Sequence, residues 1–239
     1  MTLVEHIGEL RRRLITCVVV LVITATVAFV VYPHILNFLK DPYCRSVGPR
    51  HCYLYVTGPL DGLALRIKIA TYGGLFLASP VILWEVWRFI TPGLRRNEKR
   101  YAIPFIGASI TLFAAGAVLA YYTFPHALQF LEKVGGPSLQ QIYSPNNYVG
   151  LIVALMAVFG ITFEFPVILV SLELVGVLKP AKLAAWRRWA IVILAAVAAV
   201  ITPSGDPFSM MALAVPLYAF YELSILIGRV LLRRRTPAA

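Results

Sequence analysis

Six long apolar stretches, separated by loops that alternate between arginine-rich and arginine-poor, constrain this chain more than any other feature. Stretches of about 18 residues or more match the roughly 30 Å hydrocarbon core of a bilayer at 1.5 Å per helical residue. Lipid offers the backbone no hydrogen bonds, so such stretches must be helices or closed barrels, and these lack the period-two alternation of barrel strands. The pattern predicts an all-α integral membrane protein with a single polytopic domain over residues 1–239.

The six predicted transmembrane helices account for most of the apolar residues, which form 59% of the chain. Their approximate ranges are 14–31, 69–90, 103–124, 148–177, 186–202 and 207–227. Apolar residues also recur at helical spacing before residue 14, which predicts an amphipathic helix leading into the first span. The last two helices are joined by a very short connection, in which Asp206 followed by Pro207 predicts a helix N-cap.

The distribution of basic residues predicts the orientation. Sixteen of the 22 Lys and Arg residues fall on one side of the predicted spans, in the N-terminal segment, residues 88–100, residues 179–188 and the tail from Arg229. Cytoplasmic loops carry an excess of these residues, so both termini are expected in the cytoplasm and the protein in the cell membrane. The net charge of +11 therefore fits lipid headgroups and topology better than nucleic acid.

Two cysteines lie in the first loop on the opposite side. Cys44 and Cys52 are eight positions apart, and an oxidising compartment would allow them to form a disulfide. Spacing does not show the Cβ geometry, so a disulfide and two free thiols are both open.

Two carboxylates in the arginine-rich segments are candidate binding groups. Glu9 can pair along its own helix with Arg12 or Arg13, and Glu98 can form a solvated salt bridge with its basic neighbours. Alternatively, Glu9 and Glu98 together receive a cationic peptide, because a guanidinium forms two parallel hydrogen bonds with a carboxylate and lysine does not.

Further acidic residues lie within the predicted spans. Glu164 is near the middle of the fourth helix, where a charge costs at least about 2.5–3.5 kcal/mol, and Pro166 frees the carbonyl of Thr162. These features favour a wet, protein-lined hollow, with a protonated or partnered structural glutamate as the alternative. Two other sets are expected to be structural pairs at the interface: Glu85 with Arg88, and Glu222 with Arg229.

Several motifs of enzymes are absent from the sequence. It contains no Walker sequence, no glycine-rich nucleotide loop and no nucleophile elbow, and its four histidines have no metal-ligand spacing. We therefore expect no enzyme activity, no cofactor and no metal. The alternative function is a proton-coupled secondary transporter or channel for small solutes, with Glu164 and Asp206 as relay groups. Against it, the sequence shows no pair of interrupted helices in corresponding halves.

Four segments, in order and with matching spacing, resemble the TatC family, the receptor subunits of the twin-arginine protein translocase. They are EHIGELRRRL from residue 5, WRFITPGLRRNEKR from residue 87, TFEFP from residue 162 and TPSGDPFS from residue 202. The resemblance covers nearly the whole chain. It implies a six-helix, glove-shaped fold with cytoplasmic termini, and binding of signal peptides that bear paired arginines on folded cargo.

The resemblance also implies site residues and partners. It implies that Glu9 and Glu98 bind the signal peptide with Phe89 beside them, and we include Arg11 in this site. It implies that Glu164 lines the concave face. The implied partners are single-span TatA and TatB subunits in an oligomeric complex that uses the proton gradient. The Cys44–Cys52 pair and Asn97 are departures from what we expect across the family.

Overall fold

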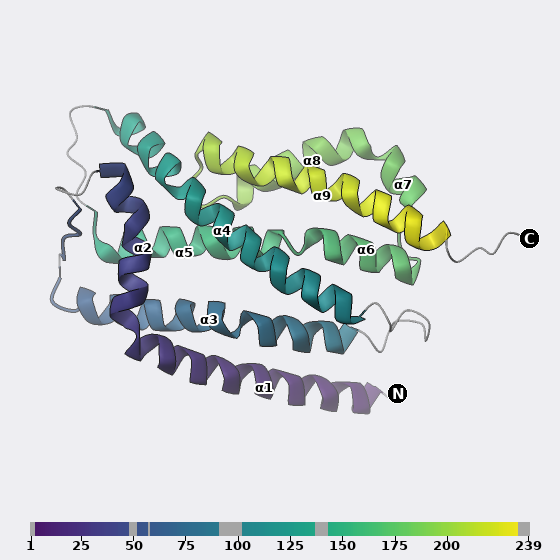
Figure 1. Ribbon diagram of the computed structural model, residues 1–239, viewed down its shortest axis with the longest axis horizontal. Helices are drawn as coiled ribbons and strands as arrows, with labels where there is room; N and C mark the ends of the chain where they lie inside the picture. Colours follow the sequence, from purple (N-terminus) through teal and green to yellow (C-terminus); the bar gives the residue numbers. More distant parts are fainter. Residues whose placement is uncertain (1–2, 48–51, 57, 91–101, 137–142, 234–239) are drawn as a thin grey trace, which may run out of the picture. The chain divides into compact units, whose positions relative to one another are not determined.

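The computed structural model describes residues 3–47, 52–56, 58–90, 102–136 and 143–233, and all regular secondary structure within them is helical (Figure 1). The helices are α1 (Leu3–Val30), α2 (Tyr32–Val47), α3 (Asp61–Ile90), α4 (Ala102–Gly135), α5 (Pro145–Thr162), α6 (Phe165–Val175), α7 (Pro180–Ala185), α8 (Arg187–Ile201) and α9 (Pro207–Arg233). The predicted all-α class is confirmed. The chain forms two compact units: unit 1 is Met1–Gly93 with Leu131–Val153, and unit 2 is Leu94–Phe130 with Ala154–Ala239.

Five segments of the described residues are long and apolar enough to cross a bilayer. They are Ile7–Val30, Asp61–Phe89, Ile103–Gly135, Pro145–Val175 and Pro207–Leu231. The predicted helix 186–202 corresponds to α8, which has 15 residues. At 1.5 Å per residue α8 is about 22 Å long, shorter than the hydrocarbon core. The predicted helical lead-in before residue 14 is confirmed, because α1 begins at Leu3 and runs on without a break.

The sequence did not predict α2. This helix follows α1 after a bend at Val31 and contains Pro42. It buries Leu39 and Tyr43 but leaves Phe38 exposed, so it is amphipathic rather than uniformly apolar. A search for long apolar stretches therefore does not detect it.

In unit 1, α1 and α3 lie side by side and antiparallel (Figure 1). A Cβ atom on Gly74 would come within 2.6 Å of the Ala25 backbone, so a glycine is needed for this close approach. The Thr24 hydroxyl donates to the Gly74 carbonyl at 2.8 Å, and the Arg66 guanidinium lies 4.2 Å from the centre of the Phe29 ring. These contacts fix the register, so the first turns of α1 lie beside the last turns of α3.

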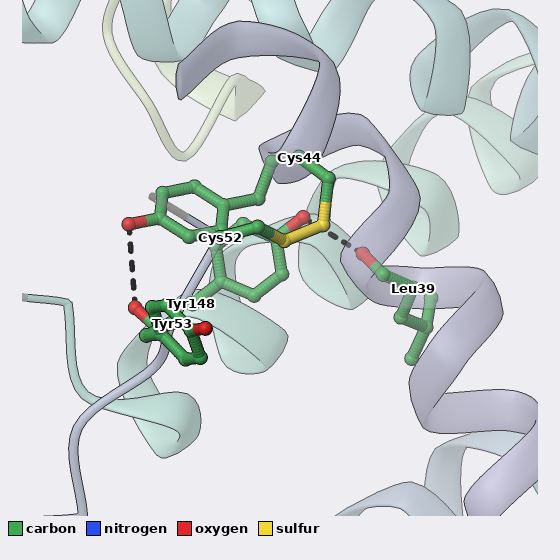
Figure 2. The surroundings of a disulfide bond; sticks show 6 residues. Leu39, Cys44, Cys52, Tyr53 and Tyr148 are labelled. Atoms are coloured by element: carbon green, nitrogen blue, oxygen red, sulfur yellow. Dashed lines mark hydrogen bonds between the residues drawn. A yellow bond between two sulfur atoms is a disulfide. The ribbon is translucent and has the colours of Figure 1, made fainter. Parts of the chain in front are cut away.

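The other end of unit 1, which we call the disulfide end, contains a disulfide between Cys44 and Cys52 (Figure 2). It joins the last turn of α2 to residues 52–56, which have no regular secondary structure. The buried Tyr148 hydroxyl donates to the Leu39 carbonyl at 2.7 Å (Figure 2). The Tyr55 amide donates to the Tyr143 carbonyl at 3.2 Å. Burial, with a contribution from Glu132, raises the pKa of Tyr143 to about 12, so this hydroxyl stays protonated at neutral pH.

Hydrogen bonds also tie the start of α3 to the start of α5 at the disulfide end. Lys68 Nζ donates to the Asn146 carbonyl at 2.8 Å, and the Asn146 side-chain amide donates to the Asp61 carbonyl at 3.2 Å. The Asp61 carboxylate in turn accepts the Gly58 amide at 2.8 Å. The segments that meet here are far apart in the sequence, so this end of unit 1 depends on tertiary contacts.

In unit 2, α9 packs against α6, α7 and α8. The Phe163 and Phe220 rings meet edge to face with centroids 4.9 Å apart, and the Tyr221 hydroxyl donates to the Leu183 carbonyl at 2.7 Å. The predicted N-cap of α9 is confirmed, since the Ser209 amide donates to Asp206 Oδ1 at 2.7 Å. Gly205 has φ of +60°, a conformation that favours glycine in this tight hairpin.

Candidate functional site

Three charged side chains from two helices meet at the end of unit 1 that carries the N-terminal arginines, which we call the arginine end. The Arg13 guanidinium lies between the carboxylates of Glu9 on α1 and Glu85 on α3. Arg13 Nη1 donates to Glu85 Oε2 at 2.8 Å, and Arg13 Nε donates to Glu9 Oε1 at 3.2 Å. Arg13 Nη2 donates to the same Glu9 oxygen. We call these three residues the Glu9–Arg13–Glu85 cluster.

The geometry of the cluster follows from helix spacing and from the register of α1 and α3. Glu9 and Arg13 are four residues apart, so they lie on one face of α1 and form the helix pair that the sequence allows. The sequence also predicts a pair between Glu85 and Arg88; the structure instead directs Glu85 across to Arg13, while Arg88 is exposed. Glu85 pairs with Arg13 because the face of α3 that carries Glu85 packs toward α1.

The cluster is only partly accessible to solvent. The exposed fractions of the Arg13, Glu9 and Glu85 side chains are 14%, 23% and 15%. Charge-assisted hydrogen bonds in such surroundings are stronger than in water. Two carboxylates from different helices thus hold one guanidinium between them.

The other residues predicted for this site are placed differently. Arg11 is exposed on α1, and Phe89 is half-buried in the last turn of α3, one turn beyond Glu85. Glu98 lies outside the described residues. The structure therefore brings Glu9 together with Glu85, which sequence reasoning did not assign to the site, and the joint action of Glu9 and Glu98 stays a prediction.

Glu164 belongs to unit 2, at the two-residue break between α5 and α6. The sequence predicts one helix over 148–177, but Pro166 has no amide hydrogen and the helix is interrupted at Phe163 and Glu164. The Glu164 amide donates to the Ile161 carbonyl at 3.1 Å, in a tighter turn than an α-helix. Glu164 therefore lies where the backbone departs from the α-helix.

The Glu164 side chain is buried, with 7% of the residue exposed. The Ser109 hydroxyl, itself fully buried, hydrogen-bonds the carboxyl group, and Oε1 has no hydrogen-bond partner among the described residues. The carboxyl group thus has one partner and, in the part of the chain that the structure describes, one oxygen without a partner, and burying such an oxygen is costly. A functional role for Glu164 stays a prediction beside that of a partnered structural glutamate.

Asp206 has a structural role in the hairpin before α9. It is fully buried, caps α9 through the Ser209 amide and accepts a hydrogen bond from the Ser204 hydroxyl. Both carboxylate oxygens are thus engaged within the hairpin. This arrangement gives no support to Asp206 as a relay group.

Unit 2 also contains a groove with a cavity volume of about 590 Å³. Apolar residues of α5, α6, α8 and α9 form most of its wall, including Ile161, Phe165, Leu194 and Leu217. Lys182 and Trp186 also line it. Among the described residues, no group of three or more His, Cys, Asp or Glu side chains comes together as a metal site would require.

Comparison with known proteins gives consistent family matches. The family model described as Sec-independent protein translocase protein (TatC) matches residues 5–216. The Sec-independent protein translocase protein TatC of Frankia casuarinae is 39% identical over 238 residues, which are 95% of this chain and 65% of that protein. The protein of the same name from Aquifex aeolicus is 37% identical, with 98% of each chain covered. The chain therefore spans slightly less than two thirds of the Frankia protein and nearly all of the Aquifex protein.

Solved structures show the same similarity. A crystal structure of the twin arginine translocase receptor TatC matches with a TM-score of 0.76 and 37% identity, covering 94% of this chain and 98% of the other. A crystal structure of the twin arginine translocase receptor TatC in DDM matches with a TM-score of 0.78 and 38% identity, covering 93% and 99%.

Proposed function

Because the chain belongs to the TatC family, and is thus a multi-pass membrane component of the Sec-independent protein translocase, we propose that it is the receptor for twin-arginine signal peptides. It binds the paired arginines of signal peptides on folded proteins and organises partner subunits for export. The proposal goes beyond the family assignment, because it names the ligand and the binding residues.

The observation that supports this proposal is the Glu9–Arg13–Glu85 cluster. Here two carboxylates from different helices hold a guanidinium through charge-assisted hydrogen bonds. This is the chemistry that a receptor for arginine side chains needs, because the planar fork of arginine makes contacts that an ammonium group does not copy. In the proposed receptor, Glu98 provides a further carboxylate, with Phe89 and Arg11 at the edge of the site.

The wider proposal concerns orientation and partners. The bias of Lys and Arg supports a cytoplasmic location of both termini and of the arginine end of unit 1, in a protein of the cell membrane. Single-span TatA and TatB subunits are the proposed partners in an oligomeric complex, and the proton gradient supplies the energy for transport. Glu164 acts in this account as a buried polar group that faces a ligand or partner within the membrane.

A peptide titration tests the receptor proposal. Detergent-solubilised protein should bind a fluorescent signal peptide with an Arg-Arg pair more tightly than the same peptide with Lys-Lys. Glu98→Gln should weaken Arg-Arg binding at least several-fold, because it removes one carboxylate. Glu132→Gln, at the end of α4 and away from the arginine end, is the matched control. Equal affinity of wild type and Glu98→Gln contradicts the role of Glu98, and equal affinity for both peptides contradicts the receptor proposal.

A further inference from the structure

We propose that Arg13 occupies the guanidinium site of the receptor in the absence of a signal peptide, and that Glu85 is the second carboxylate of that site. A signal arginine then binds by displacing Arg13 from Glu9 and Glu85. This inference rests on the proposed function and adds two residues to it. It also assigns to Arg13 a part in discriminating arginine from lysine.

The geometry supports an internal ligand. The Arg13 guanidinium is held from two directions: Nε and Nη2 point to Glu9, and Nη1 points to Glu85. Glu9 and Glu85 come from helices whose register is fixed by the close approach of Gly74 to Ala25. The backbone positions of the two glutamates are therefore fixed relative to each other, and a guanidinium of similar reach can take up the position between their carboxylates.

Charge and burial favour exchange over simple loss of Arg13. The three side chains are each less than a quarter exposed, and without a cation the two carboxylates would face one another in a poorly solvated site. Departure of Arg13 is thus unfavourable unless another cation replaces it. Arg13 lies in the N-terminal half of α1, where the preceding residues Arg11 and Arg12 are exposed, so its charged head can move on its long stem to the membrane surface when it is displaced.

The same competition explains how the site would reject lysine. An incoming side chain has to replace hydrogen bonds that Arg13 makes to both carboxylates. A second guanidinium can reproduce them, whereas an ammonium group is a compact point charge without the planar fork. A ligand must therefore bind the two carboxylates more strongly than Arg13 does.

A purely structural role for Arg13 leads to the opposite expectation. If Arg13 only fastened α1 to α3, then its removal would loosen the two helices and weaken peptide binding. If Arg13 is the internal occupant, its removal leaves two carboxylates that an arginine peptide can bind without competition from Arg13. The direction of the change in affinity therefore separates the two roles.

The experiment compares variants of the full chain in detergent, titrated with Arg-Arg and Lys-Lys signal peptides. Arg13→Met keeps the apolar stem and removes the guanidinium, Arg13→Lys keeps the charge and loses the fork, and Glu85→Gln removes the second carboxylate. Arg12→Met is the matched control, because the exposed Arg12 side chain lies outside the cluster. A thermal-stability measurement identifies any variant that fails to fold.

We expect Arg13→Met to bind the Arg-Arg peptide about tenfold more tightly than wild type, because no side chain at position 13 then competes for the carboxylates. The affinity of Arg13→Lys should lie between the two, because lysine competes through its charge but lacks the planar fork. The preference for Arg-Arg over Lys-Lys should fall in Arg13→Met. Glu85→Gln should weaken binding several-fold, and Arg12→Met should change little.

Weaker or unchanged Arg-Arg binding by both Arg13 variants, with the arginine preference unaltered, overturns the inference while leaving the receptor proposal in place. If Arg13→Met does not fold, Arg13→Lys alone decides by the same two readouts. Absence of any Arg-Arg preference in the wild type is the different result that overturns the receptor proposal itself.

Discussion

Removal of the disulfide between Cys44 and Cys52 should loosen the disulfide end of unit 1 in a measurable way. The two cysteines are eight positions apart, so the bond closes a loop of about nine residues. By the chain-entropy relation, the disulfide removes about 8.7 cal/mol/K of entropy from the unfolded chain. Replacing both cysteines by serine therefore lowers the stability by about 2.6 kcal/mol at 25 °C. Residues 52–56 should open more often as a result. The hydrogen bond from the Tyr55 amide to the Tyr143 carbonyl is one of the contacts that remain, so its opening can be followed.

Hydrogen exchange followed by mass spectrometry measures this opening. A change of 2.6 kcal/mol corresponds to roughly 80-fold faster exchange at the Tyr55 amide if the disulfide acts fully on local opening. Exchange in α9, which belongs to unit 2, should stay nearly constant. Cys17→Ser, in α1, is the matched control for a cysteine replacement. Acceleration of less than about threefold at Tyr55, or equal acceleration in α9, would refute the reasoning.

Three further predictions concern unit 2. Gly116→Ala should lower the thermal midpoint in detergent, because its Cβ would lie 2.5 Å from the Phe159 carbonyl oxygen and overpacking costs about 1–3 kcal/mol. Gly107→Ala is the control in the same helix, and it should raise the midpoint slightly because a Cβ atom there has open space around it; equal midpoints of the two variants would contradict the prediction. Glu173→Met should stabilise the protein by about 1–3 kcal/mol, because neither carboxyl oxygen of this fully buried residue has a hydrogen-bond partner among the described residues; a lower midpoint would count against it. Asp206→Ala should weaken the start of α9 by about 1 kcal/mol through loss of the cap, seen as faster exchange at the Ser209 amide, and unchanged exchange would be the opposing result.

Features that depend on the chemistry of a local segment could be predicted from the sequence. Apolar length identifies the long helices, since bilayer thickness and helix rise are fixed quantities. The Asp206 cap is local too, because the capping carboxylate and the amide it accepts are three residues apart. The interruption at Glu164 could be anticipated in part, because Pro166 removes a backbone donor wherever it lies in a helix.

The rest depends on how distant segments meet. Arg13 and Glu85 are 72 residues apart, and only the register of α1 against α3 brings them together. The adjacent glycines Gly73 and Gly74 are the sequence feature that indicates this close contact of α3 with α1, since small residues mark close helix contacts. The helix α2 was missed because its apolar residues form one face rather than a continuous stretch. Glu98 lies outside the described residues, so its place beside Glu9 is still a prediction.

The most direct test of the account is a double-mutant cycle between Glu9 and a signal arginine. Wild type and Glu9→Gln would each be titrated with an Arg-Arg peptide and with a peptide in which one arginine is replaced by citrulline, its neutral isostere. We expect a coupling energy of about 1–3 kcal/mol for one of the two arginines, as befits groups in direct contact. Additive effects within about 0.5 kcal/mol for both arginines would contradict the claim that Glu9 binds the signal peptide.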